Sequence, residues 1–306
     1  MSKKMLKRSL ALGALMAFVI TGQAWAEEFT NGLNAHKENL TFDSLSVTGP
    51  DGSTGVYNAN AKKLMVTGSS YIDVERDSDL TGIYAVLGSS STFGSSENST
   101  TEVYVHTTND TSYKTQGVLS MGVGTTVNFG GKEFTLNVSS DKGEAYGIWT
   151  DTYGTESRND DDVLASVNLN AANNNIIVKG IGDAIGIYSM DFSKVEATGN
   201  LTINTVYDDN KVGRAILTRQ SEIAINKDGK GTVKIDGDIT FYGYKNSRDS
   251  IVDITLNNSY SYLNGNIYTL TYSGQESIND GDVNGMKLTI SNSATWKVLK
   301  IALLIL

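Results

Sequence analysis

The chain has 306 residues, of which 39% are hydrophobic and 8% aromatic, and it carries a formal net charge of −9 with no cysteine. The negative charge argues against a nucleic-acid partner, because phosphates would repel the protein. The lack of cysteine excludes disulfides and thiolate metal sites. With 31 glycines and one proline, Pro50, the composition instead favours uninterrupted β-strands joined by glycine-containing turns.

Residues 1–26 have the organisation of a secretory signal peptide. Four basic residues come first: Lys3, Lys4, Lys7 and Arg8. The apolar run "LALGALMAFVI" follows, and Ala24 and Ala26 supply the small side chains expected before a cleavage point after Ala26. An uncleaved anchor is the alternative, but the run is shorter than the roughly twenty residues that a membrane-spanning helix needs. We therefore expect an exported mature chain that begins at Glu27 and has lost four positive charges.

Short runs that alternate apolar and polar residues occupy most of the mature chain, and a helical period is absent from its pattern. Such runs, rich in Val, Ile, Thr and Tyr and ended by Gly, Asn, Asp or Ser, are typical of strands with one buried face. The runs are "KLMVTG" from 63, "EVYVHT" from 102, "FTLNVS" from 134, "NIIVKG" from 175, "LTINTV" from 201, "TVKIDG" from 232, "VDITLN" from 252, "IYTLTY" from 267 and "MKLTIS" from 286.

A short step of sequence recurs between these runs. It reads "TGVYN", "TGIYA", "QGVLS", "YGIWT" and "IGIYS", and its glycines are Gly55, Gly82, Gly117, Gly147 and Gly186. A bridging piece such as "TTVNFGG", "ASVNLNA" or "SKVEATG" follows, and then an alternating run. Self-similarity over a few tens of residues indicates a solenoid, whose units bury their apolar faces by stacking. The pattern predicts an all-β, right-handed parallel β-helix.

In this β-helix the recurring glycine would allow a bend between two faces, and the next residue would stack inside. We therefore predict one inward ladder formed by Ile83, Val118, Ile148 and Ile187. Loops at residues 89–101 and 151–162 would absorb the variable spacing, and roughly eight to ten coils would form a rod of about 40 to 50 Å. A β-sandwich is the alternative, since it also has many short strands.

The stretch "NAANNN" at 170–175 would form a corner with hydrogen-bonded amides or a plain polar loop.

The segment "LTISNSATWKV", residues 288–298, resembles passenger domains of bacterial type V autotransporters. The resemblance covers residues 27–298 and implies a pertactin-like β-helix adhesin, which a C-terminal β-barrel of the same polypeptide carries across the outer membrane. This chain instead continues after Val298 with "LKIALLIL", so we expect an interrupted reading frame and a barrel that is absent here. The expected organisation is a signal peptide at 1–26, a β-helix passenger at 27–298 and an apolar tail at 299–306. An uncovered last coil with this tail would favour end-to-end self-association.

Residues with catalytic chemistry are few. His36 and His106 are the only histidines, and nucleophile motifs of the G-D-S-G, G-D-S-L or G-x-S-x-G type are absent from the sequence. The segment "DGDVNG" at 280–285 matches the front half of a calcium loop, but Ser291 stands where the twelfth-position acid belongs. Other acidic pairs and triplets are predicted to be solvated loops: Asp160, Asp161, Asp162, Asp208 and Asp209. The arginines that could neutralise a substrate carboxylate are Arg158, Arg214, Arg219 and Arg248.

These observations favour a non-enzymatic β-solenoid that displays loops for attachment to host or bacterial surface glycans or proteins. A β-helical polysaccharide lyase or hydrolase is the alternative. We predict no catalytic, cofactor-binding or metal-binding residues, no nucleic-acid partner and no small-molecule cofactor. The signal peptide predicts the cell surface or secretion in a Gram-negative-type envelope, or the periplasm if the barrel is missing.

Overall fold

The computed structural model describes residues 26–108, 114–152, 164–208, 211–242, 250–270, 276–277 and 285–299. Its strands, β1 to β30, are short and follow one another along the chain in three sheets. The described residues include no α-helix, and therefore none long and apolar enough to cross a membrane. The fold is all-β, as the alternating sequence pattern predicts.

The three sheets are named A, B and C here, in the order in which the chain visits them. Sheet A contains β1 (Glu27–Phe29), β4 (Leu45–Thr48), β7 (Ser70–Arg76), β10 (Thr100–Thr107), β13 (Glu133–Ser140), β16 (Asn173–Gly180), β19 (Asn200–Tyr207), β23 (Val233–Asp236), β26 (Tyr262–Asn264) and β30 (Thr295–Lys297), and β20 (Lys211–Val212) pairs with β19. Sheet B contains β2 (Leu33–Asn34), β5 (Thr54–Asn58), β8 (Leu80–Val86), β11 (Lys114–Met121), β14 (Glu144–Asp151), β17 (Ala184–Met190), β21 (Arg214–Arg219), β24 (Asp238–Tyr242), β27 (Ile267–Leu270) and β28 (Glu276–Ser277). Sheet C contains β3 (Leu40–Phe42), β6 (Lys63–Val66), β9 (Ser90–Phe93), β12 (Thr126–Phe129), β15 (Ser166–Leu169), β18 (Lys194–Ala197), β22 (Glu222–Ile225), β25 (Ile251–Leu256) and β29 (Met286–Ile290).

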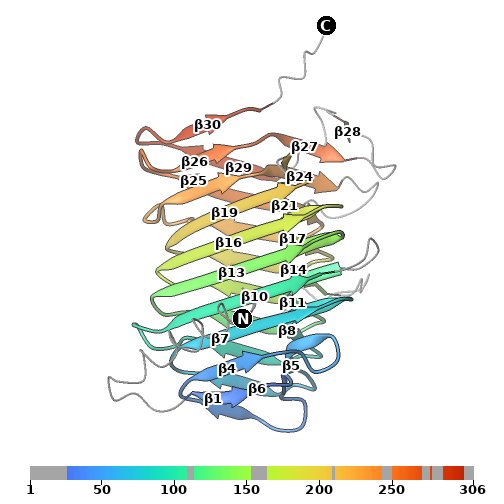
Figure 1. Cartoon of the computed structure of the whole chain (residues 1–306). Coiled ribbons are helices and arrows are strands. Elements are labelled where there is room, and N and C mark those ends of the chain that lie inside the picture. The colour runs from blue at the N-terminus through green and yellow to red at the C-terminus, as the bar shows by residue number, and fades with distance from the viewer. Residues whose placement is uncertain are drawn as a thin grey trace, which may run out of the picture.

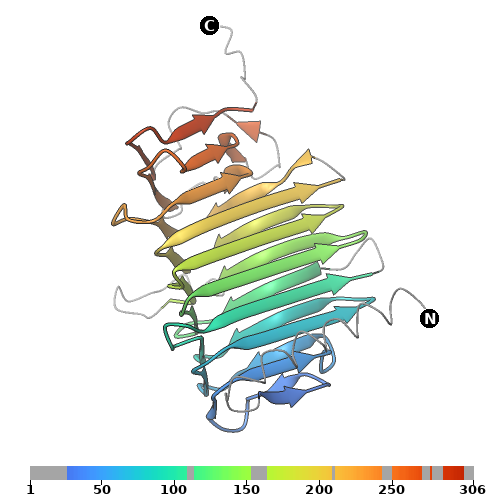
Figure 2. The ribbon, with the colours of Figure 1, turned by 60° about the vertical axis from the view of Figure 1, so that its left-hand side comes forward.

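Each strand lies beside the strand one coil later, so the chain winds as a parallel β-helix (Figures 1 and 2). Among the described residues sheet C has 9 strands, which come from successive coils, and this agrees with the eight to ten coils expected. The antiparallel pairs among the described strands are β19 with β20 and β27 with β28. The parallel pairing of the main strands excludes the β-sandwich. The right-handed sense stays a prediction, and it is the sense that parallel connections nearly always take.

The predicted inward ladder is confirmed. In sheet B, Val118 pairs with Ile83 on one side and Ile148 on the other, and Ile148 pairs with Ile187. All four side chains are 0% exposed. The same column continues in both directions through other apolar residues: Leu33, Val56, Ile216, Ile239 and Ile267. Stacking of equivalent residues thus forms one core along the length of the solenoid.

The recurring glycine lies inside each sheet B strand, where the interior is narrow. A Cβ atom at Gly117 would lie 2.6 Å from Leu136 Cδ1 and 2.7 Å from Val138 Cγ2, both on sheet A. Real carbon pairs prefer about 3.5 to 4.0 Å. The residues that pair with the neighbouring strands do not include this glycine. The buried Ile or Val comes directly after it, so the alternation of inward and outward residues along the strand is interrupted there. Glycine is therefore required because two sheets approach closely. The predicted bend between two faces is wrong, because each of these glycines lies within a sheet B strand.

Two predicted loop boundaries are wrong. Residues 89–101 were expected to form a loop, but β9 occupies Ser90–Phe93 and pairs with β6 and β12. Phe93 points inward and stacks on Phe129 with ring centroids 5.6 Å apart, so burial of one aromatic ring overrides the weak strand propensity of the serines. Likewise Asn173–Asn175 are the first residues of β16, and the corner is confined to the residues before them. Residues 153–162 of the second predicted loop lie outside the described residues.

Candidate functional site

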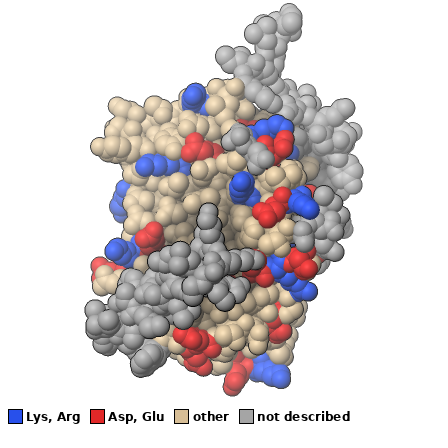
Figure 3. Space-filling model, viewed as in Figure 1, with Lys and Arg blue, Asp and Glu red and all other residues tan. Residues whose placement is uncertain are grey.

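Charged side chains are scattered over the face of the molecule drawn in Figure 3. Basic and acidic groups lie intermixed there, and most of the described surface carries neither. A polyanion needs an extended field of positive charge. The described part of this face therefore lacks the extended positive field that a polyanion needs. Two surfaces on the outside of the coils are candidate sites.

The first surface is an aromatic cluster on the outer side of sheet B. Trp149 lies between Tyr146 and Tyr188, with ring centroids 5.0 Å away in each case. The Lys114 ammonium lies 5.1 Å from the Trp149 ring centroid, within the range of a cation–π contact. However, Tyr146 is only 6% exposed, and Ile185 and Leu217 beside it are 2% and 3% exposed. The cluster is a second, smaller core that stabilises the outside of sheet B, and little of it can touch a ligand.

Arg–Asp pairs flank this cluster. Arg219 donates from Nη2 to both carboxylate oxygens of Asp191, at 2.7 and 2.6 Å, and from Nε to Oδ1 at 3.1 Å. Arg214, at the other end of the same strand β21, donates from Nη1 to Asp183 Oδ2. Such charge-assisted bonds hold side chains in fixed positions. Two of the four arginines considered for substrate binding are therefore occupied by carboxylates of the protein itself, while Arg158 and Arg248 lie outside the described residues.

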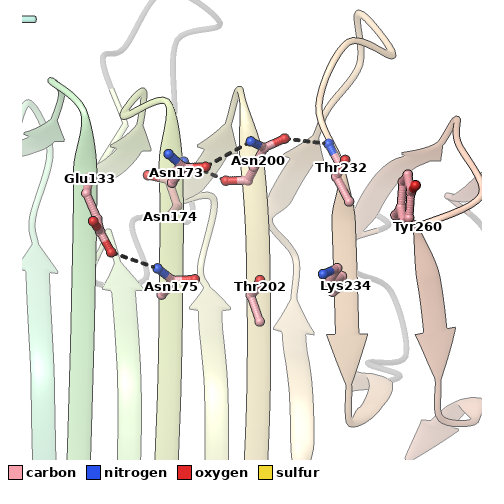
Figure 4. A pocket seen from close by; sticks show the side chains of 9 residues that line it. All are labelled: Glu133, Asn173, Asn174, Asn175, Asn200, Thr202, Thr232, Lys234 and Tyr260. Carbon is pink, nitrogen blue, oxygen red and sulfur yellow. Dashed lines mark hydrogen bonds between the residues drawn. The ribbon is translucent and has the colours of Figure 1, made fainter.

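The second surface is an open pocket of about 370 Å³ on the outer side of sheet A. Figure 4 shows its side chains rising from successive strands, with Tyr260 at one end. Apart from this ring, every lining residue is polar: Glu133, Asn173, Asn174, Asn175, Asn200, Thr202, Thr232 and Lys234. A cavity lined by amides, hydroxyls and single charges is suited to a ligand with many hydrogen-bonding groups.

Coil stacking places the lining residues in two adjacent columns. In the first, Asn173 pairs with Glu133 on one side and with Asn200 on the other. In the second, Thr202 pairs with Asn175 and with Lys234. Because a lining residue and its partner in the next coil are 27 or more residues apart in the chain, the sequence alone does not bring these residues together. The rigid ladder of sheet A fixes their spacing.

Hydrogen bonds within the first column hold its amides in place (Figure 4). The Asn200 amide donates to Asn173 Oδ1 at 2.9 Å, and its own Oδ1 accepts from the Thr232 backbone N–H at 2.8 Å. Asn175 donates to Glu133 Oε1 at a longer 3.4 Å. Asn174 is 1% exposed and donates to carbonyls at the corner, so its role is to fix the turn. Of the two alternatives for residues 170–175, the structure has the hydrogen-bonded amides, on strand β16 rather than at a corner, and they form one wall of the pocket.

The second column has unused bonding capacity. Among the described residues, neither the Thr202 hydroxyl nor the Lys234 ammonium has a hydrogen-bond or ion-pair partner. Tyr260 is 74% exposed, and the next most exposed large hydrophobic residue of the described surface is Leu87 at 60%. Free polar groups beside an exposed ring are what a binding site needs. We therefore identify this pocket as the candidate site.

Tyrosine–carboxylate pairs border the pocket on sheet A. Tyr262 donates to Asp236 Oδ2 at 2.8 Å, and burial together with this bond raises the pKa of Tyr262 to about 12. Tyr104 donates to Glu102 Oε2 at 3.0 Å, and its pKa is raised to about 12, chiefly by burial. At neutral pH both phenols are protonated donors, so the sheet beside the pocket keeps a fixed hydrogen-bond pattern.

The two histidines lie apart on different sheets. His36 follows β2 and contacts Asn34 and the Tyr57 ring. His106 lies on β10, where its Nδ1 is 2.7 Å from Ser139 Oγ and its Nε2 is 3.6 Å from Asp141. They form no common site, and both bond to nearby polar side chains.

The predicted acidic loops lie largely outside the described residues. This applies to the aspartate triplet, to Asp209 and to the calcium-like segment. The residues concerned are Asp160, Asp161, Asp162, Asp209, Asp280, Asp282 and Asn284. Asp208 is described and pairs with Lys211. Within the described ranges, no group of three or more His, Asp or Glu residues is arranged to hold a metal ion.

Sequence reasoning named no binding residues and so missed the pocket. The sequence shows the row of pocket residues only when its coils are aligned by their inward residues, Ile176, Ile203 and Ile235, which pair in register. The residue just before each of these faces outward, which places Asn175, Thr202 and Lys234 in one row. The alignment depends on knowing which strands share a sheet.

Comparison with known proteins adds no relative. No family model, no curated protein and no solved structure matches this chain. The chain is therefore classified by its architecture, as a parallel β-solenoid with three parallel sheets.

Proposed function

We propose that this protein is a non-enzymatic, secreted or surface-exposed β-solenoid that attaches to other surfaces, in the manner of an adhesin-like autotransporter passenger. The observation that carries the proposal is the open polar pocket on sheet A, with its free Thr202 and Lys234 and exposed Tyr260. The signal-peptide pattern at 1–26 and the "SNSATWKV" segment support export and the passenger-like assignment.

A rigid scaffold suits this role. Every main strand of sheet A between the end strands β1 and β30 hydrogen-bonds to the coil before and after it, so lining residues from distant parts of the chain keep fixed positions. Binding to a preformed surface costs less conformational entropy than binding to flexible loops. The expected contact thus lies on the face of a sheet rather than on displayed loops.

The alternative is a β-helical polysaccharide lyase or hydrolase. Such an enzyme needs a basic group free to take a proton beside an acidic group. Arg214 and Arg219 are each bound to an aspartate, which leaves them held as cations in ion pairs. The free Lys234 of the pocket lies on β23, three strand positions from Glu133 on β13, so it is not beside that carboxylate. This arrangement supports the non-enzymatic proposal.

Adhesion of coated beads tests the function. Beads carrying residues 27–306 should be retained on epithelial cells or on bacterial lawns, and beads carrying the urea-unfolded chain should wash off. In parallel, incubation with pectin, chitin and glycosaminoglycans in the presence of calcium should release no reducing ends. Absence of retention on every surface, or reproducible release of sugar, would contradict the proposal.

A further inference from the structure

We infer that the pocket on sheet A binds a neutral saccharide chain that lies along the long axis of the β-helix. This inference rests on the proposed function and specifies the ligand class of its site. It follows from the bonding groups of the pocket, from its direction across the strands and from its balance of charge.

The lining groups match hydroxyl groups in both bonding roles. An amide such as that of Asn175 both donates and accepts, the Thr202 hydroxyl does the same, and Glu133 accepts while Lys234 donates. A sugar hydroxyl likewise donates one hydrogen bond and accepts others. A ligand with hydroxyls along its whole length is therefore able to satisfy every free group of the two columns.

Other ligand classes fit less well. An apolar ligand would strand the amides without partners, at a cost of about 1 to 3 kcal/mol for each buried group. A peptide strand binds by adding to a free sheet edge. Here the backbones of β13, β16, β19 and β23 already pair with one another, so the pocket presents side chains alone.

The direction of the pocket indicates an extended ligand. Its lining spans β13, β16, β19, β23 and the turn before β26, which are five successive positions across sheet A. At about 4.8 Å per strand, the row is about 19 Å long. That length accommodates several linked sugar rings in a row across the strands, rather than a single ring.

Tyr260 closes one end of this row. Its ring is 74% exposed and has no ring partner among the described residues. The apolar face of a pyranose ring can stack on an aromatic ring, which supplies contact area in an otherwise polar site. Tyr260 would thus hold one sugar ring, and the amide and hydroxyl columns would bind those that follow.

The charge of the pocket favours a neutral chain. One carboxylate, Glu133, and one ammonium, Lys234, cancel within the lining. The whole chain has a net charge of −9, which repels polyanions at long range. Acidic polysaccharides should accordingly bind less tightly than neutral ones of the same length.

Titration calorimetry of residues 27–306 tests the inference. The probes are three neutral hexasaccharides, cellohexaose, maltohexaose and chitohexaose, with hexagalacturonic acid as the acidic comparator. We expect at least one neutral hexasaccharide to bind and the acidic one to bind at least tenfold less tightly. Tyr260→Ala should weaken binding about tenfold, and Asn175→Ala about fivefold, as expected for one stacked ring and one hydrogen bond.

Asn168→Ala is the matched control. Asn168 also belongs to an outward amide ladder, with a 2.8 Å bond to Asn128, but on sheet C away from the pocket. Its replacement should leave the affinity unchanged. Lack of binding by all neutral probes, equal losses in the pocket and control variants, or tighter binding of the acidic probe would overturn the inference.

The bead assay separates this inference from the proposed function. Beads that still adhere when coated with the Tyr260→Ala, Asn175→Ala double variant would refute the saccharide pocket and leave attachment intact. Beads of the unchanged protein that do not adhere anywhere would refute attachment itself.

Discussion

Replacement of Gly117 by alanine tests why glycine recurs in sheet B. The added Cβ would meet Leu136 Cδ1 at 2.6 Å, Val138 Cγ2 at 2.7 Å and the Gly147 carbonyl oxygen at 2.6 Å. Overpacking of a core costs about 1 to 3 kcal/mol. We expect a loss of about 3 kcal/mol, because the Gly147 oxygen belongs to the backbone of the next coil and moves only if that coil moves.

Gly182→Ala is the matched control. The nearest atoms to its added Cβ would be Glu144 Cγ at 3.4 Å and two atoms at 3.7 Å, which are ordinary contacts. A glycine replaced under such conditions leaves stability unchanged or raises it by up to about 1 kcal/mol, because the unfolded chain loses freedom.

Urea unfolding followed by far-ultraviolet circular dichroism measures both variants. Solenoids can unfold in parts, so the midpoint of the first transition is compared among the proteins. Gly117→Ala should shift that midpoint to lower urea and Gly182→Ala should not. A Gly117→Ala protein as stable as the unchanged one would refute the close-approach explanation.

Three further predictions concern packing, ion pairs and pH. Ile148→Ala should cost about 2 to 5 kcal/mol in urea unfolding because it empties a fully buried position, whereas Ile177→Ala, at a 41% exposed position, should cost less than about 0.5 kcal/mol. Arg219→Ala should cost about 1 to 3 kcal/mol because it strands a carboxylate whose side chain is 14% exposed, and Lys230→Ala should leave the unfolding midpoint unchanged. The pKa of Tyr104 is raised from 10.0 to about 12, so the stability that its protonated phenol contributes is complete below pH 10 and is lost as the pH rises to about 12. Tyrosinate absorbance at high pH should contain this late component, and Tyr104→Phe should reduce its amplitude without abolishing it, because the pKa of Tyr262 is also raised to about 12; a titration complete by pH 11 would contradict the assignment.

The repeated apolar step was enough to predict the coil architecture. An inward Ile or Val after each glycine has one way to be buried in every unit, namely by stacking on its equivalent, and the structure has this arrangement. Strand β9 was missed because Ser90 and Ser91 hide the alternation that ends at Phe93. Its strand character comes from neighbours one coil away, which a local pattern does not contain.

The candidate site depends even more on distant neighbours. Asn175, Thr202 and Lys234 are ordinary outward residues in three separate runs, and none of them carries a motif. Their shared position follows from the strand register, and the lack of partners at Thr202 and Lys234 becomes visible only in three dimensions. The Arg219–Asp191 pair was hidden for the same reason, since the two residues are 28 positions apart.

A crystal structure of residues 27–306 with the tightest-binding neutral hexasaccharide tests the account most directly. We predict sugar rings in a row across β13, β16, β19 and β23, one ring stacked on Tyr260, and sugar hydroxyls within hydrogen-bonding distance of Asn175 and Thr202. A saccharide bound on another face, or an empty pocket at saturating ligand concentration, would contradict it.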